Sequence, residues 1–148
     1  MPTFGLTALL RALAVWFLLM AAESVQGTLR HLLSGGETVF LVRQISVLTG
    51  AVIIFAITWL CMRWMDLRTA RGALAVGGLW VVLTLAFDFG LGRATGASWR
   101  GMLVDYDLLH GGLMPLGLLA MGLTPWTVRK LRHAEHVIAI KAAFPPDG

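Results

Sequence analysis

Charged residues are scarce in this chain: Asp, Glu, Lys and Arg make up only 14% of its 148 residues, whereas 57% are hydrophobic and the mean hydropathy is +0.78. A water-soluble domain of this length has too little interior to hide so much apolar surface. The composition therefore excludes an ordinary soluble enzyme and indicates a membrane protein, with lipid as the solvent for much of the chain.

Cysteine is nearly absent as well, since Cys61 is the only one. A single cysteine excludes an internal disulfide, a redox pair of the CxxC type and a zinc site built from cysteines. A redox reaction carried by the chain's own thiols is therefore not expected.

A basic patch with interleaved aromatic residues is also missing, although the net charge is +4. The twelve Lys and Arg residues are spread along the chain and gather at the ends of apolar runs. A nucleic-acid groove needs continuous positive charge with aromatic stacking platforms. The basic residues instead fit the sorting of positive charge to the cytoplasmic side of a membrane, and no nucleic-acid partner is predicted.

Long hydrophobic runs, by contrast, are abundant, and a helix needs about 20 apolar residues to cross a bilayer. They predict an all-α integral membrane four-helix bundle, residues 1–128, with spans at about 4–33, 39–62, 72–92 and 108–128. Residues 129–148 are predicted to form a basic amphipathic helix on the membrane surface and a frayed end. In the fourth span Pro115 is expected to cause a kink, because proline has no backbone N–H.

A signal peptide is the alternative interpretation of the first segment, whose uninterrupted apolar core, Ala12–Ala22, is short. Against cleavage, the region before this core has no early positive charge, and Met20 stands where a small residue is needed. We therefore expect the first segment to be a span.

Orientation follows from the Lys and Arg residues in the connections. Seven flank one side, namely Arg63, Arg68, Arg71, Arg129, Lys130, Arg132 and Lys141, and four flank the other, namely Arg30, Arg43, Arg93 and Arg100. The difference predicts a bacterial inner-membrane protein with both termini in the cytoplasm.

Most polar residues in or beside the spans then fall at the outer, periplasmic face. This cluster consists of Glu23, Gln26, Arg30, Arg43, Gln44, Asp88, Arg93, Asp105, Tyr106, Asp107 and His110. With Arg100, it holds four carboxylates and four guanidinium groups. An unpaired charge in hydrocarbon costs about 2.5 kcal/mol or more, so we expect ion pairs, which the planar fork of arginine suits.

Four functions remain open for this cluster. The favoured hypothesis is a structural one: paired charges join the outer ends of the helices, and the protein is an accessory subunit of a membrane complex. A second hypothesis is a small solute, ion or proton-coupled transporter, in which Glu23 and Asp88 are the working carboxylates, because ionisable residues inside a membrane are usually functional.

A metal or haem site is a third hypothesis, with His31, His110 and nearby acids as ligands, but the arginines would repel a cation. A membrane enzyme using Tyr106 is the fourth, although Asp105 and Asp107 would point to nearly opposite sides of a helix.

No cofactor is predicted. The expected partners are the lipid bilayer and other membrane subunits or a second copy.

Three runs carry a family resemblance: residues 23–30 (ESVQGTLR), 88–93 (DFGLGR) and 105–117 (DYDLLHGGLMPLG). Together they resemble a group of short bacterial inner-membrane proteins with no assigned activity. The resemblance extends to about Arg132 and implies a bacterial membrane origin only. The chain is also similar to the small multidrug exporters in its four spans and first-span glutamate. It is longer and its acid lies near the outer boundary, so their function is not carried over.

Overall fold

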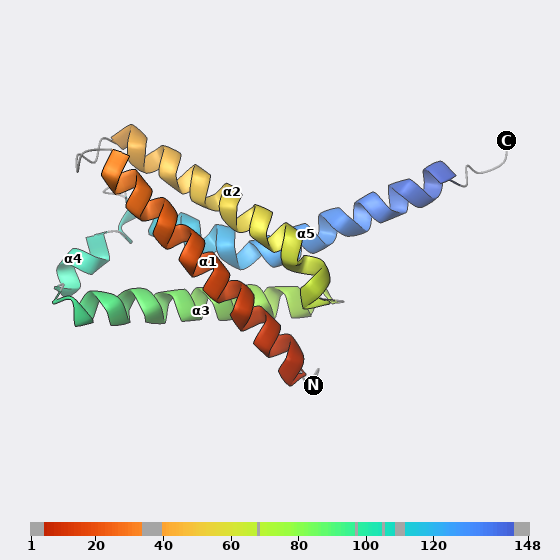
Figure 1. Ribbon diagram of the computed structural model, residues 1–148, viewed down its shortest axis with the longest axis horizontal. Helices are drawn as coiled ribbons and strands as arrows, with labels where there is room; N and C mark the ends of the chain where they lie inside the picture. Colours follow the sequence, from red (N-terminus) through yellow and green to blue (C-terminus); the bar gives the residue numbers. More distant parts are fainter. Residues whose placement is uncertain are drawn as a thin grey trace.

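The computed structural model describes residues 5–33, 40–67, 69–96, 98–104, 106–108 and 112–143, and all five elements in these ranges are helices. They are α1 (Leu6–Leu33), α2 (Phe40–Met65), α3 (Ala70–Ala94), α4 (Trp99–Val104) and α5 (Met114–Ala143). Figure 1 shows α1 running diagonally across α3, with α2 and α5 alongside, and α4 at the end where α3 finishes. The expected all-α class is confirmed.

Three of the helices are long and apolar enough to cross a membrane: Leu6–Leu29 of α1, Ile45–Met65 of α2 and all of α3. They correspond to the first three predicted spans. The start of α3 is set by Thr69, whose side chain accepts a hydrogen bond from the backbone N–H of Gly72 at 3.0 Å, a standard N-cap. Its end is followed by Gly96, whose φ of +81° favours glycine.

The fourth predicted span differs from the structure. The helix begins at Met114, not near Leu108, so Pro115 lies in its first turn, where no N–H is needed, and the expected kink there is wrong. Pro125 is instead the proline inside the helix. From Met114 to Val128 the apolar part is about 22 Å long at 1.5 Å per residue, which is shorter than a bilayer core.

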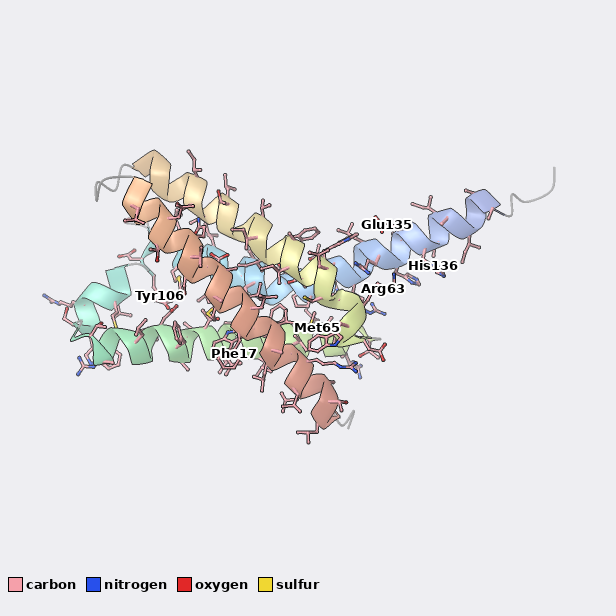
Figure 2. All side chains as sticks on the ribbon, in the orientation of Figure 1. Phe17, Arg63, Met65, Tyr106, Glu135 and His136 are labelled. Atoms are coloured by element: carbon pink, nitrogen blue, oxygen red, sulfur yellow. The ribbon has the colours of Figure 1, made fainter. Side chains whose placement is uncertain are left out.

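The predicted tail is not a separate element either. The helix α5 continues without interruption to Ala143, and its last part projects beyond the other helices (Figure 1). Every described side chain from His133 onward is exposed, including Glu135 and His136, which Figure 2 labels on this projecting part. The described side chains of this end of α5 are therefore not buried against the other described helices.

Tryptophans from two helices join α1 to α3 in the core. Trp80 and Leu19 are 0% exposed, and Trp80 donates its indole N–H to the carbonyl of Ala12 at 2.9 Å. Trp16 donates to Oγ1 of Thr84 at 3.0 Å. Both indole N–H groups are thereby satisfied, as burial of tryptophan requires.

Glycines bring α3 and α5 into direct backbone contact. A Cβ atom added to Gly77 would lie 1.9 Å from the carbonyl oxygen of Gly122. Gly77, Trp80 and Thr84 are among the buried residues of α3. Small residues permit such close helix approach.

One end of the bundle carries arginine–tryptophan contacts, and we call it the basic end. Arg11 donates to the carbonyl of Trp64 at 3.0 Å and lies 5.7 Å from its ring centroid. Arg132 of α5 donates to the carbonyl of Trp59 at 2.5 Å, and its guanidinium lies 4.9 Å from the centroid of the Trp59 ring. These contacts tie both α1 and α5 to the last turns of α2. The opposite end, where α3 finishes and where Glu23 and Asp88 lie, we call the acidic end.

Candidate functional site

A cavity of about 720 Å³ opens between α1, α2, α3 and α5 toward the acidic end. Its polar lining includes Glu23, Gln26, Ser46, Thr84 and Asp88, and its apolar lining includes Met20, Ile54, Phe87, Met114, Leu118 and Met121. A volume of this size is typical of a site for a small molecule, and polar groups converging from several helices would orient one.

Glu23 of α1 is one of the two carboxylates in the cavity. Its Oε1 atom is removed from solvent and has no hydrogen-bond partner among the residues that the structure describes. Gly50 of α2 makes room for it, because a Cβ at that position would lie 2.8 Å from Oε2 of Glu23. The carboxylate therefore occupies space that any larger residue at position 50 would take.

Asp88 of α3 is the second carboxylate and lines the same cavity. Its Oδ2 atom is likewise shielded from solvent and has no partner within the described ranges. Desolvating an ionised carboxylate is costly unless a cation or hydrogen-bond donor compensates. A positively charged ligand in the cavity would supply that compensation for both acids.

The side of the cavity facing the basic end is closed by a contact centred on Thr84. Its Oγ1 accepts the hydrogen bond from Trp16 and lies 3.4 Å from the sulfur of Met121 and 3.9 Å from that of Met20. Behind this contact lies the tightly packed core of Leu19, Trp80 and their neighbours. We call this closed side the floor of the cavity.

Gln26 joins α1 to α2 beside the acids, donating from its side-chain amide to the carbonyl of Ser46 at 3.2 Å. Ser46 is buried and lines the cavity, so this bond lies beside the two acids. Gln26 thus positions the two helices that carry Glu23 and Gly50.

A smaller cavity of about 360 Å³ lies between the end of α3 and α4, and Asp88 and Met114 line both cavities. One wall is an aromatic group in which the rings of Phe89 and Tyr106 stack with centroids 5.5 Å apart. Trp99 of α4 lies 6.0 Å from Phe89 in the same group. Figure 2 labels Tyr106 on the α4 side of the bundle.

The structure brings together part of the predicted cluster. Glu23, Gln26 and Asp88 line the larger cavity, and Tyr106 lines the smaller one. Arg93 is exposed, with its guanidinium 5.3 Å from the ring centroid of Trp99.

The rest of the predicted cluster is described less completely. The carbonyl of Asp107 accepts a hydrogen bond from Gly112 at 2.8 Å. Asp105, His110 and the side chains of Arg30, Arg43 and Gln44 lie outside the described residues. The ion pairs expected for Glu23 and Asp88 are not found within the described ranges, and pairing with those arginines stays a prediction.

Several residues of the site were not singled out by the sequence. Gly50 and Ser46 are recognisable only as small residues in the polar half of the second span, and Thr84 only as part of a helix stripe. Met20 and Met121 carry no sequence signal that separates them from ordinary core residues. Within the described ranges, no three His, Cys, Asp or Glu side chains gather closely enough to hold a metal ion.

Comparison with known proteins adds no relative. No family model, no curated protein and no solved structure matches the chain.

Proposed function

We propose that this chain is a small membrane transporter that binds a positively charged solute in the larger cavity, with Glu23 and Asp88 as its anionic anchors. One observation carries the proposal: carboxylates from two helices face one cavity, and an oxygen of each is buried without a described partner. A solute cation would give both carboxylates the stabilisation that they receive from water in solution.

A purely structural role for these acids is supported less well. Charges that join helix ends stabilise a bundle when they pair in a dry contact, because a buried carboxylate without a partner is destabilising. The space of about 720 Å³ beside Glu23 and Asp88 is larger than such a contact needs. It is comparable with the volume of small-molecule sites in proteins.

The membrane setting of the proposal rests on the three apolar helices. Placement in a bacterial inner membrane, with both termini in the cytoplasm and the acidic end at the periplasmic face, belongs to the proposal. It agrees with Lys130 and Arg132 of α5 lying over the rings of Trp126 and Trp59, since cations and tryptophans gather at a membrane boundary.

Transport requires that the floor opens. The Trp16–Thr84 hydrogen bond and the thioether contacts of Met20 and Met121 would have to separate to let a solute pass. The helix α5 is suited to move, because Pro125 removes one of its backbone hydrogen bonds close to Met121.

Uptake into proteoliposomes tests the proposal. A panel of sodium, tetramethylammonium and benzylammonium would be offered under an inside-negative membrane potential, with benzyl alcohol as the neutral comparison. We expect the wild type to accumulate at least one cation, and E23Q to lose uptake by at least about tenfold while it still inserts and folds. E135Q is the matched control, because Glu135 is exposed on the projecting part of α5. Equal uptake by E23Q and the wild type would contradict the proposal.

An accessory role in a larger membrane complex is the second candidate. It is favoured by the end of α5 from His133 onward, where every described side chain is exposed. Isolated helices this short are marginally stable in water, so a partner subunit would stabilise it. Truncation after Arg132 should then abolish co-purification of one defined subunit in mild detergent, and unchanged co-purification would exclude this surface.

A further inference from the structure

The smaller cavity has features that the proposed transport site does not explain. It lies between the end of α3 and α4, has a volume of about 360 Å³ and shares Asp88 as a lining residue with the larger cavity. Any ligand in it would therefore have a carboxylate at one side. Its other walls include Met102 and Met114, which are adaptable apolar side chains.

The aromatic wall of this cavity suits a cation. Phe89 and Tyr106 both line the cavity, and their rings stack with an interplanar angle of 16°. The face of an aromatic ring carries negative charge density and attracts cations. The same aromatic group already holds one, because the guanidinium of Arg93 lies over the ring of Trp99, whose centroid is 6.0 Å from that of Phe89.

We propose that the smaller cavity is a second binding site, selective for a small organic ammonium or guanidinium ion with an apolar part. The cationic head would lie beside Asp88, and the apolar part would lie against Phe89, Tyr106 and Met102. This inference rests on the proposed function, because the site would receive the solute before it reaches Glu23. The shared Asp88 makes the two sites neighbours along one path.

The cavity favours an organic cation over a bare metal ion. Asp88 is the one carboxylate among its described lining residues, whereas metal ions that bind oxygen take six or more ligands. Ring faces and thioether walls add little for such an ion and much for a cation with an apolar body. Discrimination should therefore depend on the aromatic rings.

Two measurements on the full-length protein in lipid nanodiscs test the inference. The first is calorimetric titration with benzylammonium, compared with benzyl alcohol and sodium. We expect benzylammonium to bind more tightly than either, and F89L and Y106L each to weaken it by at least about fivefold. F17L is the matched control, because Phe17 is 66% exposed on α1 and lines neither cavity.

The second measurement is photocrosslinking of the wild type with azidobenzylammonium, which does not depend on the folding of a variant. Crosslinks at Phe89, Met102 or Tyr106, competed by benzylammonium, support the second site. Crosslinks confined to the larger cavity, or full affinity in both F89L and Y106L, overturn it.

The inference and the proposed function fail in different ways. Loss of binding in E23Q with no effect of F89L and Y106L leaves the proposed function standing and removes the second site. Unchanged binding in E23Q with weakened binding in F89L and Y106L supports the second site and contradicts the proposed function. A wild type that binds benzylammonium no better than benzyl alcohol overturns both.

Discussion

The contact between Gly77 and Gly122 makes a sharp prediction about stability. A Cβ atom at position 77 would lie 1.9 Å from the carbonyl oxygen of Gly122 and 2.8 Å from its carbonyl carbon. Both are backbone atoms of α5, so no side-chain rotation can relieve the overlap. The substitution Gly77→Ala must therefore push α5 away from α3.

The neighbouring glycine supplies the control, because a Cβ at Gly78 would have nothing within 4 Å. Inserting a methyl group into a packed contact costs about 1–3 kcal/mol. Since rigid backbone is in the way, we expect G77A to lose about 3 kcal/mol of unfolding free energy. G78A should change it by less than about 1 kcal/mol, the size of the helix-propensity difference between Gly and Ala.

The measurement is reversible unfolding in detergent micelles, followed by circular dichroism, for the wild type and the two variants prepared alike. Equal stability of G77A and G78A would refute the reasoning, because it would mean that the α3–α5 backbone contact does not exist in the folded protein. Destabilisation of G78A alone would mean that the face of α3 carrying Gly78, about 100° around the helix, is the packed one.

Two further substitutions test other contacts by the same unfolding assay. Thr84→Val removes the acceptor of the Trp16 indole N–H and leaves that buried donor unsatisfied, so a loss of about 1–3 kcal/mol is expected; no loss would mean that the floor is not closed by this bond. Arg132→Met removes both the hydrogen bond to the carbonyl of Trp59 and the cation–π contact with its ring, so a loss of about 1–2 kcal/mol of unfolding free energy is expected. Arg63→Met is the control, and it should have little effect because Arg63 is exposed. Equal effects of the two arginine substitutions would argue against the α2–α5 link.

The first three helices were predictable because long apolar runs bounded by polar residues determine them almost alone. The predicted span at 72–92 lies inside α3, and the predicted span at 39–62 ends three residues before α2 does. Gly77, Trp80 and Thr84 are buried in α3 and follow one another at intervals of three and four residues, which is the spacing of buried positions on a helix.

The fourth predicted span was misplaced for a definite reason. Leu108 is apolar and hydropathy alone extends a span to it, but the helix begins only at Met114. Proline is tolerated in the first turn of a helix, where its missing N–H has no intrahelical partner, whereas proline in the middle of a helix removes a hydrogen bond. Pro115 was thus a helix-start signal rather than a kink signal. The short helix α4 has no strong periodicity and was missed.

The candidate site was predictable in its acids but not in its shape. Glu23 and Asp88 stand out because ionisable residues are rare in apolar helices. The expectation that they pair with arginines came from charge balance, which counts residues without placing them. Whether two opposite charges meet depends on helix rotation and crossing angle, and neither can be read from a sequence.

The cavity and the glycine contact have a common geometric origin. At Gly77 and Gly122 the backbones of α3 and α5 touch, and at Trp80 the helix α1 is held against α3. Asp88 lies eleven residues beyond Gly77, about 16 Å along the helix, and there the helices no longer fill the space between them. Helices that cross at an angle must separate on either side of their closest approach. The position of the glycine contact therefore determines the depth of the cavity. We expect G77A to weaken cation binding as well as the stability of the fold, and G78A to weaken neither.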